Sequence, residues 1–106
     1  YAGRYNSAPA WSPKGDKIAF AGWDKTHFDL FLVNSDATNM ERLTKFAKDN
    51  EEPSFSSDGR IIMFHSTRRG NKHKKKSDIY MINTNGLGEQ IILKDFGRST
   101  NPVWTN

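Results

Sequence analysis

Apolar residues along this chain gather in runs of about six residues, and segments rich in Gly, Pro, Asn, Asp and Ser separate these runs. KIAFAG begins at Lys17 and FDLFLVN at Phe28, and similar runs follow as IIMFHS from Ile61 and SDIYMIN from Ser77. Runs of this length and composition are typical of β-strands. The pattern predicts an all-β chain without a convincing helix, since the best helical candidate, TKFAKDNEE from Thr44, is short.

The predicted strands belong to two copies of a repeat of roughly 45 residues. One set of matching positions lies 44 residues apart and pairs Pro9 with Pro53, Trp11 with Phe55, Gly15 with Gly59 and Phe20 with Phe64. A second set lies 49 residues apart and pairs Asp29 with Asp78, Phe31 with Tyr80 and Asn34 with Asn83. The second copy therefore carries an insertion between Phe64 and Asp78. A third copy begins at NPVWTN, where Pro102 and Trp104 continue the spacing.

Each copy reads as four short strands joined by tight turns. The first strand ends in SPKG or SSDG, turn sequences that close on glycine. The second turn, SDATN or TNGLG, is rich in Asn, Asp and Gly. Strands in this order, separated by such short turns, predict an up-and-down antiparallel meander in each copy.

These motifs resemble the TolB-type β-propeller repeat, a relative of the WD repeat. That repeat reads approximately P-x-W-S-P-D-G-K-x-I-A-F, then D-I-Y-x-x-N-x-D-G, then R-L-T. The first copy has WSPKGDKIAF, DLFLVNSD and ERLT, and the second has FSSDGRIIMF, DIYMINTNG and QIIL. Departures occur at two turn positions, Lys14 and Ser57. The resemblance implies a partial propeller of two blades plus one strand, with blade 1 at about 6–45, blade 2 at about 50–94 and the start of blade 3 at about 100–106.

Two kinds of recurring residue have structural interpretations. Trp11, Phe55 and Trp104 are expected to pack between blades. Asp29 and Asp78 precede the third strand of each copy, where a short acidic side chain can accept hydrogen bonds from backbone or hydroxyl groups. We expect that role for the two aspartates rather than metal binding.

Composition narrows the class of protein further. The chain has 106 residues, no cysteine and 13 aromatic residues, and its mean hydropathy is −0.79. The absence of cysteine excludes disulfides and thiolate metal sites. No apolar stretch approaches the length of a membrane-spanning helix, and we expect no signal peptide within these residues.

Positive charge is concentrated in one segment, RRGNKHKKK, at Arg68–Lys76. It carries six positive charges, so the formal net charge of the chain falls from +4 to −2 without it. Nucleic acid binding is disfavoured, because this segment has no aromatic residues for base stacking and the remaining chain is net acidic. A solvated insertion and contact with anionic lipid, cell-wall polymer or an acidic partner both remain open.

No enzyme motif is present. The sequence has no G-x-S-x-G, H-E-x-x-H or P-loop segment, and His27, His65 and His73 are scattered without the spacing of metal ligands. We interpret His65 as an ordinary strand residue. The sequence predicts a non-enzymatic protein with no catalytic residue, no cofactor and no assigned metal. Carboxylates and amides converging before the first strands could hold a hard cation such as Ca²⁺, the residues being Asn50, Glu51, Glu52 and Asn101.

Surface recognition is the favoured function. In a propeller, the connections between strands two and three, and between strand four and the next blade, emerge on one face around the channel mouth. Loops on a rigid scaffold commonly carry function. The candidate partner-binding residues on this face are Lys48, Asn50, Glu51, Glu52, Arg68, Arg69, Lys72, Lys74, Lys75, Lys76, Arg98 and Asn101.

The resemblance implies a periplasmic protein-interaction module of a bacterial cell-envelope complex, which binds peptides or proteins such as a peptidoglycan-associated lipoprotein. An alternative is the gating propeller of a prolyl-oligopeptidase-like or tricorn-like peptidase, whose catalytic domain lies elsewhere. A third is a propeller within a larger envelope lipoprotein. Propellers typically close with about four to eight blades, so the ring requires either further blades of a longer chain or several copies of this one.

Overall fold

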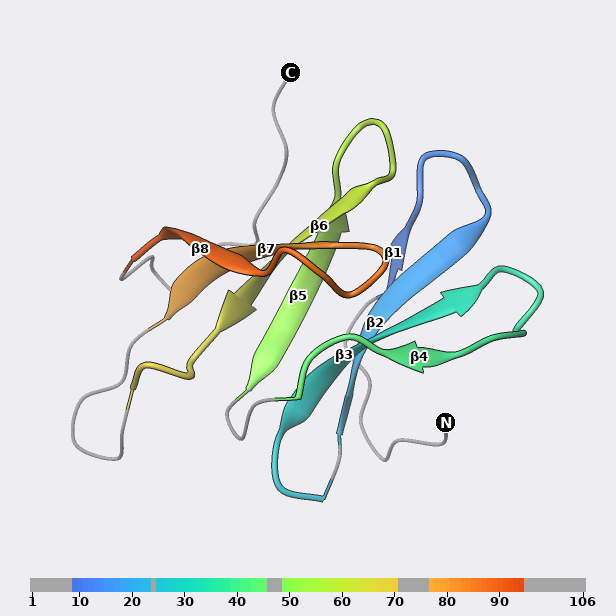
Figure 1. Cartoon of the computed structure of the whole chain (residues 1–106). Helices are drawn as coiled ribbons and strands as arrows, with labels where there is room; N and C mark the ends of the chain where they lie inside the picture. Colours follow the sequence, from blue (N-terminus) through green and yellow to red (C-terminus); the bar gives the residue numbers. More distant parts are fainter. Residues whose placement is uncertain (1–8, 24, 46–48, 71–76, 95–106) are drawn as a thin grey trace.

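The computed structural model describes residues 9–23, 25–45, 49–70 and 77–94. These residues form two four-stranded antiparallel sheets whose strands follow one another in chain order (Figure 1). Sheet 1 contains β1 (Ala10–Trp11), β2 (Lys17–Trp23), β3 (Phe28–Asn34) and β4 (Glu41–Arg42). Sheet 2 contains β5 (Asn50–Phe55), β6 (Ile61–Ser66), β7 (Asp78–Asn83) and β8 (Gln90–Leu93). The predicted all-β fold with two meanders is confirmed, and no described residue is helical.

Residues 100–106 lie outside the described part of the chain, as do residues 6–8 at the start of the first predicted blade. The predicted opening strand of a third blade, with Trp104, therefore stays a prediction. The same holds for the outer limits of the predicted blades.

The repeat reappears in the strand register. Phe20 lies opposite Phe31 across β2 and β3, and Phe64 lies opposite Tyr80 across β6 and β7. Both pairs of rings are stacked, with centroids 5.6 Å and 5.9 Å apart respectively. Because a cross-strand aromatic pair stabilises a sheet, each copy carries the same stabilising pair at its centre.

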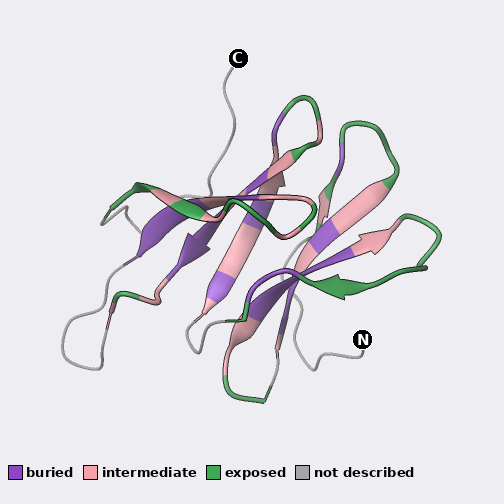
Figure 2. Ribbon diagram, in the orientation of Figure 1, coloured by how far each residue is buried: buried purple, intermediate pink, exposed green. Residues whose placement is uncertain are grey.

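The two sheets pack on each other through opposite faces. Sheet 1 contributes Ala19, Ala21, Leu30 and Leu32 to the shared core, and sheet 2 contributes Ile62, Phe64, Tyr80 and Ile82. Side chains alternate between the two faces of a strand, and Phe64 matches Phe20 in the repeat, not Ala19 or Ala21. The alanine-bearing face of one sheet therefore receives the aromatic face of the next. Figure 2 shows the buried residues on the inner strands, whereas β4 is exposed.

The aromatic residues of the first strands differ in their packing. Phe55 in β5 packs against the core, as predicted. Trp11 is 59% exposed in the two sheets described, so its packing against another blade stays a prediction. Since Phe55 packs on the core shared with sheet 1, the equivalent Trp11 faces away from sheet 2.

Candidate protein-binding site at one end of the sheets

One end of the molecule brings together the connections that the sequence placed on a single face. Asp49, which precedes β5, accepts a hydrogen bond at Oδ1 from the backbone N–H of Phe28 (2.9 Å). Its backbone carbonyl accepts from the N–H of Thr67 (3.0 Å), and its own N–H donates to Thr67 Oγ1 (3.2 Å). Asp49 thus ties the β4–β5 connection to the starts of β3 and of the β6–β7 connection.

A pocket of about 130 Å³ opens at this end. Its lining combines three carboxylates with an imidazole and two hydroxyl groups: Asp49, Glu51, Glu52, His65, Thr67 and Ser77. Carboxylate oxygens accept hydrogen bonds, and their negative charge favours cations. The pocket is therefore suited to an ammonium or guanidinium group, or to a segment with exposed N–H donors.

Local backbone geometry directs the side chains of Glu51 and Glu52 into the pocket. The register of β5 on β6 shifts between Glu51 and Ser54, which marks a β-bulge or similar irregularity. Within it Glu52 adopts a φ of 57°, a left-handed conformation that costs a non-glycine residue about 1–2 kcal/mol. Bulges re-aim side chains near functional sites. Here the irregularity brings consecutive glutamates to the same pocket.

The electrostatics of the pocket affect Glu51 most clearly. Burial raises the pKa of its carboxyl above the usual glutamate value, and repulsion from the neighbouring charges of Asp49 and Glu52 raises it further. A cation placed in the pocket would relieve that repulsion.

His65 lies in β6 and is 5% exposed. Its Nδ1 lies 3.1 Å from the hydroxyl oxygen of Ser77, and its backbone is paired with Glu51 on one side and Ile79 on the other. The interpretation of His65 as a strand residue is confirmed, and the structure adds that it borders the pocket. In the described ranges, no three His, Asp or Glu side chains are arranged to hold a metal ion.

Asn50 lies beneath this surface. It is fully buried. Its Nδ2 donates to Asp29 Oδ1 of sheet 1 (3.1 Å), and its Oδ1 accepts from Nη2 of Arg68 in the β6–β7 connection (3.0 Å). Its side chain consequently links the two sheets. Asn50 supports the face from below.

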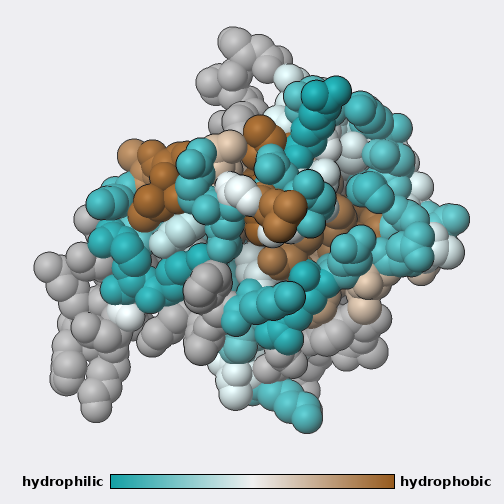
Figure 3. Space-filling view, viewed as in Figure 1, coloured by the Kyte–Doolittle hydropathy of each residue, from teal (hydrophilic) through white to brown (hydrophobic). Residues whose placement is uncertain are grey.

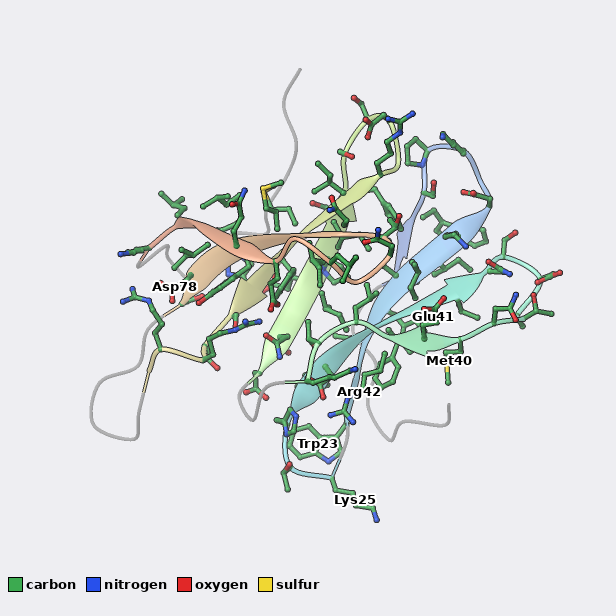
Figure 4. The ribbon with its side chains drawn as sticks, viewed as in Figure 1. Trp23, Lys25, Met40, Glu41, Arg42 and Asp78 are labelled. Carbon is green, nitrogen blue, oxygen red and sulfur yellow. The ribbon has the colours of Figure 1, made fainter. Side chains whose placement is uncertain are left out.

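Asp29 is the centre of this link. The fully buried carboxylate accepts from the hydroxyl group of Thr44 (2.9 Å) and from Arg42, and its Oδ2 lies 3.0 Å from His27 Nε2. Figure 4 shows Arg42 beside the start of β3. The predicted bond to a hydroxyl group is confirmed, but Asp29 also connects sheet 1 to β5 through Asn50.

The described arginines of the basic segment are engaged within the fold. Arg68 donates to Glu89 (2.8 Å), and its guanidinium carbon lies 4.1 Å from the centroid of the Tyr80 ring. Arg69 forms two hydrogen bonds with the buried carboxylate of Asp78 (2.8 and 2.9 Å). Both arginines therefore hold sheet 2 together at this end, whatever further contacts they make.

The remaining predicted contact residues lie outside the described part of the chain. They are Lys48, Lys72, Lys74, Lys75, Lys76, Arg98 and Asn101. Of the predicted set, the pocket brings together Glu51 and Glu52.

Sequence reasoning missed Asp49, Thr67 and Ser77 as pocket residues. The sequence did carry a signal for Thr67 and Ser77, because they flank the basic segment. Thr67 follows β6 and Ser77 precedes β7, and the ends of two paired antiparallel strands lie side by side. Asp49 had a weaker signal, since only its place in a charged connection suggested that it takes part in the site.

Comparisons with known proteins agree with this architecture. A family model described as the TolB beta propeller domain matches residues 2–73. The Tol-Pal system protein TolB of Gluconobacter oxydans is 34% identical over 107 residues, an alignment that covers 98% of this chain and 23% of that protein. This chain spans about a fifth to a quarter of the length of the curated relatives it matches.

Solved structures show the same relationship. The structure of a putative TolB from Agrobacterium tumefaciens superimposes with a TM-score of 0.76 and 27% identity, covering 87% of this chain and 31% of that one. An oligogalacturonate lyase in complex with manganese superimposes with a TM-score of 0.63 at 19% identity, covering 85% of this chain and 25% of the lyase. At that identity the similarity to the lyase concerns the fold alone.

Proposed function

Because this chain belongs to the TolB β-propeller family, we propose that it is a non-enzymatic protein-interaction module of a bacterial cell-envelope complex, acting in the periplasm. It binds a peptide or partner protein at the end of the sheets that carries the acidic pocket. The candidate partner is a peptidoglycan-associated lipoprotein, in line with the Tol-Pal name of the relative from Gluconobacter oxydans. No membrane-spanning helix occurs in the described part of the chain.

The pocket formed by Asp49, Glu51 and Glu52 is the observation that carries this proposal. It lies where two connections meet, it is built on the first strand of sheet 2, and the hydrogen bonds of Asp49 fix its shape. We assign to it a basic side chain or a row of N–H donors from the partner. The family matches favour this function over the gating propeller of a peptidase, which no contact of the described residues supports.

Calorimetric titration of this protein with the peptidoglycan-associated lipoprotein from its own organism tests the proposal. A hydrogen bond to a charged group contributes about 1.5–3 kcal/mol, so Glu51→Gln and Glu52→Gln should each weaken binding roughly ten- to a hundredfold. Asp16→Asn is the control, since Asp16 is an exposed carboxylate in the β1–β2 turn, outside the pocket. Equal affinities for the wild type and both pocket variants would refute the proposed site.

A further inference from the structure

A second depression lies away from the acidic pocket, between β4 of sheet 1 and the β7–β8 turn of sheet 2. Its volume is about 440 Å³, within the range of roughly 300–1,000 Å³ common for ligand sites. We call it the outer groove. It is lined by Glu41, Arg42, Leu43, Lys45, Ile82, Asn85, Gly86, Leu87 and Glu89.

The outer groove has an apolar floor and an apolar rim. Leu43 and Ile82 belong to the buried core, with 7% and 1% of their surface exposed. Leu87 lies at the rim and is 66% exposed. Apolar surface is visible where the β7–β8 turn lies between the sheets (Figure 3). A side chain entering here would cover Leu87 and extend the core.

The turn that presents Leu87 is held in place by its own hydrogen bonds. The N–H of Asn83 donates to the Leu87 carbonyl (2.9 Å), and the Leu87 N–H donates to Asn85 Oδ1 (2.9 Å). A Cβ at Gly88 would lie 2.7 Å from Asn83 Nδ2, so the backbone there approaches closely. A fixed rim loses little conformational entropy on binding.

The charges of the outer groove are of two kinds. Arg42 and Glu89 are engaged, the first by Asp29 and the second by Arg68. Glu41 and Lys45 form no ion pair in the ranges that the structure describes. Considering the described residues alone, the groove offers one unpaired charge of each sign. The two residues are four positions apart, which is about 13 Å along an extended chain.

The strand beside the outer groove is an exposed edge. β4 comprises only Glu41–Arg42 and is the outermost strand of sheet 1. The side chains of Met40 and Glu41 project to opposite sides of it (Figure 4). Unpaired N–H and C=O groups at such an edge can bind an extended segment, whose alternate side chains then point to one side.

From these features we propose that the outer groove binds an extended segment of a partner protein with a leucine or isoleucine between a basic and an acidic residue, each two positions away. The aliphatic side chain packs on Leu43, Ile82 and Leu87. The basic residue lies opposite Glu41 and the acidic residue opposite Lys45. This second site is independent of the pocket assigned above.

Titration with two synthetic peptides, acetyl-SKSLSES-amide and acetyl-SESLSKS-amide, tests the inference by nuclear magnetic resonance. One of the two charge orders should bind with a Kd of roughly 0.1–1 mM, as expected for a short segment. The exchange Glu41→Lys with Lys45→Glu should transfer the preference to the other peptide. Absence of binding by both peptides, or an unchanged preference after the exchange, overturns the proposal.

Leu87→Asp should weaken binding at least tenfold, whereas Ile92→Asp, which also places a charge at an exposed apolar position but outside the groove, should leave it unchanged. Circular dichroism checks that each variant is folded, and Leu87→Ser replaces Leu87→Asp if the latter does not fold. Equal binding by the Leu87 and Ile92 variants contradicts the proposal. Glu51→Gln should retain full affinity for the peptide, because Glu51 lines the acidic pocket and not the outer groove. This result would show that the two sites bind independently.

Discussion

Asp29→Ala should lower the free energy of unfolding more than the substitution of any exposed acidic residue, because it removes a link between the two sheets. The carboxylate is fully buried and receives hydrogen bonds from the Thr44 hydroxyl group and the Asn50 amide, both of which are also buried. Each donor left without a partner costs about 1–3 kcal/mol. Arg42 loses its ion pair as well, but its side chain is 37% exposed and regains water.

His27 Nε2, 3.0 Å from Asp29 Oδ2, also loses its partner. Water entering the space left by the carboxylate partly relieves these donors, which gives an expected loss of about 3 kcal/mol. For a domain of this size that corresponds to a fall in Tm of roughly 12–24 °C. Thermal unfolding followed by circular dichroism measures it. The control Glu41→Gln changes an exposed glutamate and should stay within about 0.5 kcal/mol of the wild type.

A double-mutant cycle with Asn50→Ala isolates the contact between the sheets. The amide of Asn50 donates to Asp29, so the two substitutions should be non-additive by about 0.5–3 kcal/mol. Additive effects, or a stability of Asp29→Ala equal to that of Glu41→Gln, would refute the assignment of this carboxylate as the centre of the link.

Three further predictions concern turns, pH and the basic segment. Gly15 and Gly59 both have a positive φ, 73° and 74°, so alanine at either should lower the free energy of unfolding by about 1 kcal/mol. Denaturant titration should show a larger loss for Gly59→Ala than for Gly15→Ala. A Cβ at Gly59 lies 3.0 Å from Ser12 Oγ, whereas a Cβ at Gly15 meets nothing within 4 Å. Burial, then Asp49 and Glu52, raise the pKa of Glu51; the folded state therefore holds a proton more tightly, and stability falls as pH rises from the ordinary glutamate pKa of about 4.3 to the raised value. Glu51→Gln should accordingly raise Tm at pH 7 and lose this advantage below about pH 4, and an equal gain at both pH values would contradict the reasoning. If the basic segment contacts an anionic partner, replacing its four lysines by serine should weaken binding and flatten its salt dependence, whereas unchanged titrations would exclude the segment from recognition. The four are Lys72, Lys74, Lys75 and Lys76.

The sequence predicted the strands and their order because both depend on local patterns. Phe20 and Phe64 lie at matching positions of the repeat, as do Phe31 and Tyr80, and the structure pairs Phe20 with Phe31 and Phe64 with Tyr80. Turn positions such as Gly15 were equally readable, since a tight turn ending in glycine has few alternatives. Strand runs and turn chemistry are properties of neighbouring residues, so one sequence suffices to predict them.

The candidate site was less predictable because it depends on distant contacts. Asn50 stands beside Glu51 in the sequence, yet it is buried between the sheets while Glu51 reaches the pocket. The irregular register near Glu52 separates their environments, and no simple alternation predicts it. Arg69 likewise looked like part of a solvated basic segment, whereas the buried charge of Asp78 draws it into an ion pair.

The location of the partner on this fold is the central claim, and hydrogen exchange of the complex tests it most directly. Deuterium uptake is compared with and without the peptidoglycan-associated lipoprotein. Binding at the acidic pocket predicts slower exchange of the amides at residues 49–52 and at Thr67, with no change in the turns at residues 13–16 and 57–60, which lie at the other ends of their strands (Figure 1). Protection of those turns, with exchange at residues 49–52 unaltered, would contradict the account.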